Sequence, residues 1–133
     1  MTIGESVSVS KSLLPGAGLG LFAAQAFKKN TYITMYSGES ITFAEARKRR
    51  VQTHMATREG VIIDGVRKPI EGIGGGSFAN GSPLFKNSNA KIVGQLGNLI
   101  VRSTRSIESG EEIIIHYGRR GFQIACGHAR ISH

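Results

Sequence analysis

Residues 110–118 read GEEIIIHYG and indicate what kind of fold to expect. This stretch opens with a turn around Gly110, and three consecutive isoleucines before an aromatic residue favour a strand over Ile113–Tyr117. Other short stretches of β type precede it, at residues 6–10, 31–36, 61–65, 92–93 and 99–101. Many short strands separated by turns predict a mainly β domain.

A helix is expected among these strands. Thr42 and Glu45 have the spacing of a capping box, in which the two side chains satisfy each other's exposed backbone amides at the start of a helix. The helix is predicted to run to about Thr57 and to carry the basic run Arg47-Lys48-Arg49-Arg50 on its surface. The predicted fold class is therefore mainly β with one or two helices.

The chain has 133 residues, which suits a single domain spanning residues 1–133. Cys126 is the only cysteine, so no intramolecular disulfide can form. No apolar run approaches the length of a membrane span, and the first residues are too polar for a secretory signal. We expect an intracellular, reducing location without a membrane association.

The charge balance suggests an anionic partner. Seventeen Lys and Arg face nine Asp and Glu, which gives a formal net charge of +8. A basic domain is attracted to polyanions such as nucleic acid. For the basic run at residues 47–50, contact with nucleosomal DNA, contact with a nuclear import receptor and a simple solvated helix face all stay open.

Residues 16–20 read GAGLG and first suggest a dinucleotide-binding loop, since Glu39 follows about 20 residues later. The details disagree: Pro15 would break the preceding strand, and residues 21–27 are too short for a crossover helix. The glycines instead offer bare backbone that a ligand can approach closely, or they form a plain tight turn.

Four landmarks follow one another along the chain: GLGLFA at residues 18–23, YSGE at 36–39, FANGS at 78–82 and GEEIIIHYG at 110–118. In this order they resemble the SET-domain protein lysine methyltransferases, and the resemblance covers residues 6–118. It implies a SET fold of small curled β-sheets in which the C-terminal segment threads under the asparagine loop as a pseudoknot, an exception to the usual rule against threading. It also implies S-adenosylmethionine as the methyl donor.

The resemblance assigns roles to individual residues. The expected cofactor contacts are Ala17, Gly18, Leu19, Asn80, Gly81 and Phe122. Asn80 would bind the amino-acid end of the cofactor, because a side-chain amide offers both a donor and an acceptor. Tyr117 matches the family's active-site tyrosine, and Tyr36 would line the channel for the substrate lysine. No metal ion is implied.

The sequence departs from the family pattern at three places. Gly81 stands where the family has a histidine. The second asparagine of this loop, Asn89, comes nine positions after Asn80, so the insertion at 83–87 is expected to bulge outward. The zinc-binding cysteines that follow the domain in many relatives are missing. Phe122 is the candidate to close the site instead, with an ordinary packed phenylalanine as the alternative.

The expected function is an S-adenosylmethionine-dependent protein lysine N-methyltransferase that acts on a histone or another chromatin protein. Such a substrate implies a nuclear location, or the host nucleus for a protein of a virus or an intracellular microbe. Because histone tails are basic, four acidic residues are expected to gather into one groove: Glu39, Asp64, Glu111 and Glu112. The alternative is a catalytically idle SET-like domain that binds nucleic acid or a protein partner through its basic surface. A homodimer also stays open.

Overall fold

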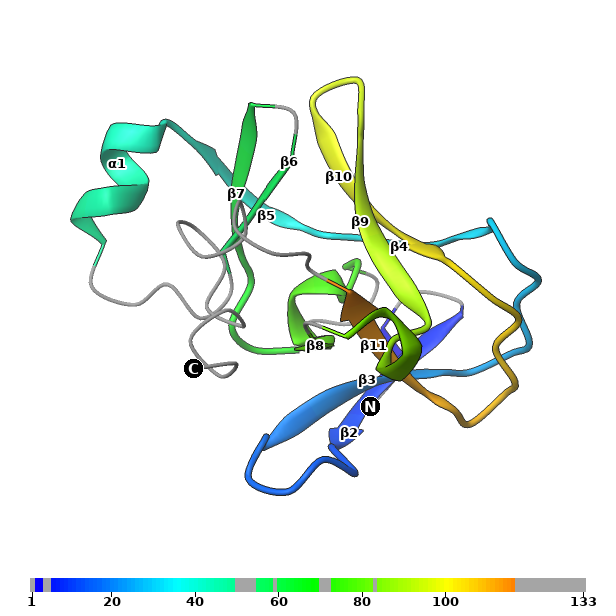
Figure 1. Ribbon diagram of the computed structural model, residues 1–133. Coiled ribbons are helices and arrows are strands. Elements are labelled where there is room, and N and C mark those ends of the chain that lie inside the picture. Colours follow the sequence, from blue (N-terminus) through cyan, green and yellow to red (C-terminus); the bar gives the residue numbers. More distant parts are fainter. Residues whose placement is uncertain are drawn as a thin grey trace.

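The computed structural model describes residues 2–3, 6–49, 55–58, 60–69, 73–82 and 84–116. Strands dominate this part of the chain (Figure 1). In chain order the elements are β1 (Thr2–Ile3), β2 (Val7–Lys11), β3 (Leu19–Ala23), β4 (Tyr32–Met35), β5 (Gly38–Ile41), α1 (Phe43–Lys48), β6 (Met55–Arg58), β7 (Val61–Gly65), the 3₁₀ turn η1 (Gly76–Phe78), β8 (Asn80–Ser82), the 3₁₀ turn η2 (Phe85–Asn87), β9 (Ala90–Gln95), β10 (Asn98–Ser103) and β11 (Glu112–His116). No helix among the described residues is long and apolar enough to cross a membrane.

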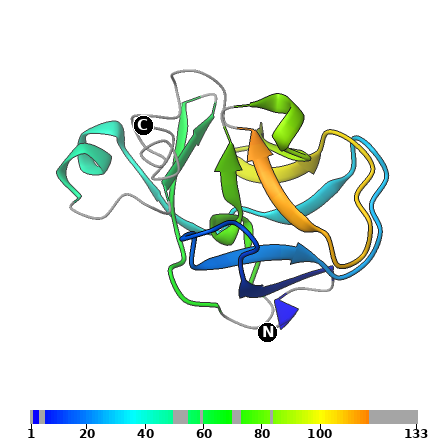
Figure 2. The same ribbon diagram turned by 60° about the horizontal axis from the view of Figure 1, so that its bottom comes forward.

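The strand β11 occupies the middle of the larger sheet. That sheet runs in the order β1-β2-β3-β11-β9-β10-β4, and β8 pairs with β11 beside this path. β11 is antiparallel to β3 but parallel to β8 and β9, so it joins the N-terminal hairpin to the rest of the sheet. Figure 2 shows β8 in green and β11 in orange side by side. The strand predicted over residues 113–117 is confirmed for residues 112–116.

The smaller sheet has the order β5-β7-β6 and is antiparallel throughout. Its residues Ala56 and Ile63 join the same apolar core as Val101 of β10 and Ile113 and Ile115 of β11. One hydrophobic core therefore lies under both sheets, and burial of its apolar surface is the main favourable contribution to folding.

The start of the helix agrees with the sequence pattern. Thr42 is the N-cap of α1, and its side-chain oxygen accepts a hydrogen bond from the backbone N–H of Glu45 at 3.1 Å. This bond satisfies one of the amides that the first turn of a helix leaves without a partner. The predicted N-terminus is confirmed, but only one half of the capping box is found among the described residues, because the carboxylate of Glu45 accepts from Arg49 Nε at 3.1 Å.

The predicted end of the helix is wrong. α1 ends at Lys48, whereas the sequence suggested about Thr57, and Met55–Arg58 form the strand β6. β6 pairs with β7, and this pairing buries Met55 and Ala56 completely. Tertiary pairing therefore overrides the helix propensity of this segment, which is a weak preference.

The predicted fold class, mainly β with one or two helices and small curled sheets, is confirmed, and the described residues contain one α-helix. The predicted turn at residues 16–20 is shorter than expected, because β3 already begins at Leu19. For the pseudoknot, β11 lies parallel to β8, the strand that begins at Asn80. The continuation of the chain after residue 116 lies outside the described residues.

Candidate functional site

The loop between β2 and β3 has an open backbone. Gly16 and Gly18 have φ angles of +75° and +74°, a left-handed conformation that favours glycine. A Cβ atom at either position would meet no atom of the described residues within 4 Å, so both glycines face open space. The N–H of Ser12 donates to the carbonyl of Gly18 at 2.7 Å and closes the loop. The loop therefore presents backbone groups that a ligand can approach.

The carboxylate of Glu112 ties this loop to the sheet. Glu112 begins β11, is only 7% exposed and accepts hydrogen bonds from Ser12 Oγ at 2.7 Å and from the N–H of Leu13 at 2.9 Å. Asn80 Nδ2 donates to the same carboxylate at 3.2 Å. A buried charge is costly unless it is hydrogen-bonded, and these three donors meet that need.

Asn80, the first residue of β8, is also 7% exposed. Its Nδ2 donates to the backbone carbonyl of Leu19 at 3.1 Å as well as to Glu112, so both amide hydrogens point into the protein. No hydrogen bond to its Oδ1 is found among the described residues. The amide is therefore held in one orientation, and its oxygen remains able to accept a bond from a ligand.

The structure brings five predicted cofactor residues together: Ala17, Gly18, Leu19, Asn80 and Gly81. The bond between Leu19 and Asn80 links the two segments. Gly81, at the position of the family's histidine, is a register partner of Ile115 in β11, so its backbone is part of the sheet. Phe122 lies outside the described residues.

Gly20 is a close-packing position that the sequence analysis missed. A Cβ atom there would collide with the carboxylate of Glu112 and come within 3.1 Å of Ser12 Cβ. Only glycine lets β3 approach this carboxylate so closely. The signal in the sequence was the third glycine of GAGLG, which was assigned to a turn.

Tyr36 directly follows β4 and is 1% exposed. Its N–H donates to the carbonyl of Leu99 at 2.8 Å, and it forms an isolated bridge with Gly75. A Cβ atom on Gly76 would come within 2.9 Å of the Tyr36 Cα, so the segment that leads to β8 packs directly on Tyr36. Tyr117, the next residue after β11, lies outside the described residues.

Asn89 is the site-supporting residue to which the sequence analysis gave no role. It is 1% exposed, its Oδ1 accepts from the N–H of Ile114 at 2.8 Å, and its Nδ2 donates to the carbonyl of Glu112 at 2.9 Å. Its own N–H donates to the carbonyl of Ile114 at 2.9 Å. These bonds hold β11 just before Tyr117. The signal in the sequence was its match to the second asparagine of the family's loop, although the insertion before it changes the spacing.

The insertion bulges outward as predicted. Residues 84–87 are exposed, with Phe85 at 60%. The ring of Phe85 meets the ring of His116 edge to face, with centroids 5.4 Å apart. The insertion therefore packs on the end of β11 without entering the core.

The expected acidic groove is divided into two groups. Glu39 and Asp64 are cross-strand partners in β5 and β7. Glu111 and Glu112 lie at the start of β11 and have other partners. Nowhere in the described part of the chain do three or more His, Cys, Asp or Glu side chains form a group that could hold a metal ion.

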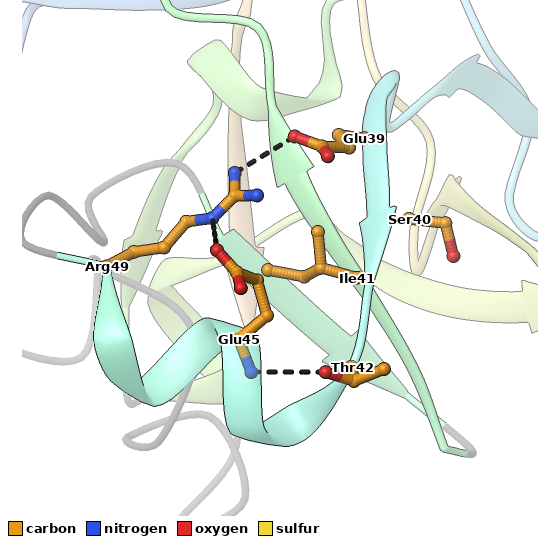
Figure 3. A pocket seen from close by; sticks show the side chains of 6 residues that line it. All are labelled: Glu39, Ser40, Ile41, Thr42, Glu45 and Arg49. Atoms are coloured by element: carbon orange, nitrogen blue, oxygen red, sulfur yellow. Dashed lines mark hydrogen bonds and ion pairs between the residues drawn. The ribbon is translucent and has the colours of Figure 1, made fainter.

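Arg49 connects the first acidic group. Its guanidinium bonds to Glu39 at 3.0 Å, to Glu45 at 3.1 Å and to Asp64 at 2.6 Å, and Figure 3 shows the first two contacts beside a shallow hollow between β5 and α1. The hydrogen bond to Glu39, followed by that to Asp64, raises the pKa of Arg49 above its usual value. One cation of the basic run, Arg49, is therefore paired with carboxylates of the same chain. Arg50 lies outside the described residues.

The comparison with known families identifies the class. A family model described as the SET domain matches residues 18–118, so this chain belongs to the SET-domain family. Proteins of this family are in general lysine methyltransferases, and they use S-adenosylmethionine as methyl donor. No curated protein matches the chain.

Solved structures share the fold at low sequence identity. The active polycomb repressive complex 2 in the stimulated state is 21% identical with a TM-score of 0.67, and the match covers 92% of this chain and 17% of that chain. The complex from Chaetomium thermophilum in an autoinhibited conformation bound to S-adenosylmethionine is 19% identical with a TM-score of 0.63. This match covers 96% of this chain and 16% of that chain. The same complex with H3K27me3 and H3K27M is 23% identical with a TM-score of 0.65, and the match covers 87% of this chain and 15% of that chain. This chain therefore spans about a sixth of the length of these proteins and shares their SET methyltransferase fold.

Proposed function

We propose that this chain is an S-adenosylmethionine-dependent protein lysine N-methyltransferase that acts on a histone or another chromatin protein in the nucleus. The observation that carries the proposal is the meeting of the Leu19 carbonyl, the Asn80 amide and the Glu112 carboxylate where β3, β8 and β11 come together. Membership of the SET-domain family supports the reaction class. Similar structures bound to S-adenosylmethionine and to histone H3 forms support the cofactor and the substrate class.

The residues of this region fit the cofactor. The backbone of Ala17 and Gly18 borders open space, and Asn80 Oδ1 would accept a hydrogen bond from the ammonium group at the cofactor's amino-acid end. Gly81 would contribute backbone groups, and Phe122 would close the site. When bound, the cofactor supplies a methyl group on a sulfonium, a group that transfers directly to an amine.

The substrate lysine must arrive neutral. With a pKa of about 10.4, roughly one free lysine in 2,500 is neutral at pH 7, a deficit of about 4.6 kcal/mol. A narrow apolar channel disfavours the ammonium form and reduces this deficit. Tyr36, buried at the end of β4, would form one wall of such a channel.

Tyr117 would orient the neutral amine through its hydroxyl. Correct orientation of two reacting groups contributes several kcal/mol to a displacement reaction. The bonds of Glu112 and Asn89 hold β11, and Tyr117 is the next residue in the sequence.

The first test is calorimetric titration with S-adenosylmethionine, together with methylation of purified histones by labelled cofactor. Asn80→Ala should weaken cofactor binding by roughly 10- to 100-fold, because it removes a bond to a charged group worth about 1.5–3 kcal/mol. Asn87→Ala, on the exposed turn η2, is the matched control and should bind normally. Unchanged binding by a folded Asn80→Ala protein would remove Asn80 from the site.

The second test is single-turnover methylation by Tyr117→Phe, with mass spectrometry to count the methyl groups. We expect a rate lower by roughly 10²–10³, with little change in stability or cofactor affinity, because only a positioned hydroxyl is lost. A wild-type rate and product pattern would contradict the role of Tyr117. Salt-dependent DNA binding by a protein that does not bind the cofactor would favour the idle SET-like domain instead.

A further inference from the structure

The outer face of β9, β10 and β4 carries cations and no acidic residue. Side chains alternate between the two faces of β9 and β10, so Ile92 and Val101 lie in the core. Lys91 and Arg102, which are register partners, lie on the opposite face. Tyr32 of β4 is the partner of Arg102 on its other side and is 52% exposed. None of the residues in the three strands is Asp or Glu.

Two turns beside the ends of β10 and β4 carry further cations, and the second of them also carries Glu108 and Glu111. Ser103 Oγ donates to the carbonyl of Lys28 at 2.6 Å, and the N–H of Ser103 donates to the carbonyl of Thr31 at 2.9 Å. Figures 1 and 2 both show these two segments, one blue and one yellow to orange, running side by side. We call the cations of the three strands and the two turns the cationic face: Lys28, Lys29, Lys91, Arg102 and Arg105.

Most of these charges are not neutralised by the protein. In the described part of the chain, the one ion pair of the cationic face joins Arg105 to Glu111 at 3.9 Å. The acidic side chains of α1, β5 and β7 are engaged by Arg49 instead. Cationic side chains without an ionic partner inside the protein are well suited to phosphate oxygens.

We propose that the cationic face docks on the phosphate backbone of double-stranded DNA. The formal net charge of +8 and the unneutralised cations match a polyanion. Tyr32 is the one aromatic residue of the three strands, whereas surfaces that bind single strands stack bases on several aromatic side chains. Contacts to phosphate position a protein without reading sequence, so this surface holds the domain on DNA of any sequence. The proposal goes beyond the methyl-transfer reaction and does not depend on the cofactor site.

The test uses fluorescence anisotropy with a labelled DNA duplex of random sequence and the full chain. The variant Lys29→Glu with Lys91→Glu should bind at least roughly 10-fold more weakly than the wild type. It should also reduce the slope of log affinity against log salt by about 1.8, since each lost phosphate contact removes about 0.9.

The matched control is Lys48→Glu with Lys68→Glu, which changes the net charge equally but lies on α1 and after β7. It should bind DNA nearly as the wild type does, and circular dichroism verifies that both variants are folded. Equal weakening by both double variants would overturn the placement of the surface, and unchanged binding by Lys29→Glu with Lys91→Glu would overturn it as well. Tighter binding of a single strand of the same length would overturn the choice of duplex.

Discussion

Two regions of the molecule hold a buried carboxylate in opposite ways. Where β3, β8 and β11 meet, Glu112 accepts three hydrogen bonds, all from uncharged donors. Beside β5 and β7, Asp64 is 4% exposed and is held by two guanidinium groups, Arg49 at 2.6 Å and Arg67 at 2.8 Å. The first region has no cation within ion-pair distance among the described residues, and the second depends on cations.

The difference predicts how each region responds to change. The ionic region reaches solvent through the exposed partners of Arg49, Glu39 and Glu45, so salt screens part of its interaction energy. The region around Glu112 is buried, and a donor or acceptor left without a partner there costs its full desolvation penalty. We expect the region around Glu112 to tolerate substitutions poorly at any ionic strength. Substitutions in the region around Asp64 should cost less stability, and their cost should fall as the salt concentration rises.

The largest effect on stability is expected for Asn89→Ala. The substitution leaves the N–H of Ile114 and the carbonyl of Glu112 without their side-chain partners in a buried place, which should cost about 3–5 kcal/mol of unfolding free energy. Urea denaturation measures the loss. Asn87→Ala, at an exposed position, should stay within about 0.5 kcal/mol of the wild type. A similar loss in both variants would show that β11 is held by other contacts.

The next effect is expected for Ser12→Ala, which removes the 2.7 Å hydrogen bond to Glu112 and the acceptor of the Leu14 N–H at 3.0 Å. A hydrogen bond to a charged group contributes about 1.5–3 kcal/mol, so the unfolding free energy should fall by about this amount. Ser10→Ala, on the exposed side of β2, serves as the control. The loss of stability should be the same at low and high salt. A loss that becomes smaller at high salt would show that the region around Glu112 depends on charge interactions, as the region around Asp64 does.

A smaller effect is expected for Asp64→Asn, which keeps the shape of the side chain but removes the charge between Arg49 and Arg67. Both guanidinium groups remain partly exposed, so the cost should be about 1–2 kcal/mol at low salt. Denaturation at about 0.1 M and about 1 M salt should show this cost shrinking, because the Debye length falls from about 10 Å to about 3 Å. A cost that does not change with salt would mean that hydrogen bonding, not charge, holds Asp64.

The smallest effect is expected for Glu45→Gln. Glu45 is half exposed and forms a pair with Arg49 four residues later on the same helix. Such pairs contribute about 0.3–0.5 kcal/mol, so thermal unfolding should change only slightly. A loss of stability larger than that of Asp64→Asn would show that Glu45, and not Asp64, is the main partner of Arg49.

Local patterns were enough to predict many elements. The N-cap at Thr42 and the strand over residues 61–65 depend on neighbouring residues, and both are confirmed. The length of the helix was predicted wrongly, because Met55–Arg58 pair with a strand that the local pattern does not include. The basic run was predicted as a helix surface, but Arg49 turns to carboxylates on β5 and β7.

The family and six of the strands could be predicted from the sequence alone, because landmark motifs and period-two patterning are properties of short segments. The contacts that hold the residues of the candidate site could not be predicted in this way. Ser12 and Asn80 lie 100 and 32 residues from Glu112 along the chain, and they meet its carboxylate only after β3 and β8 have paired with β11. The roles of Asn89 and Gly20 were likewise decided by the fold, since burial and close approach depend on contacts between distant segments.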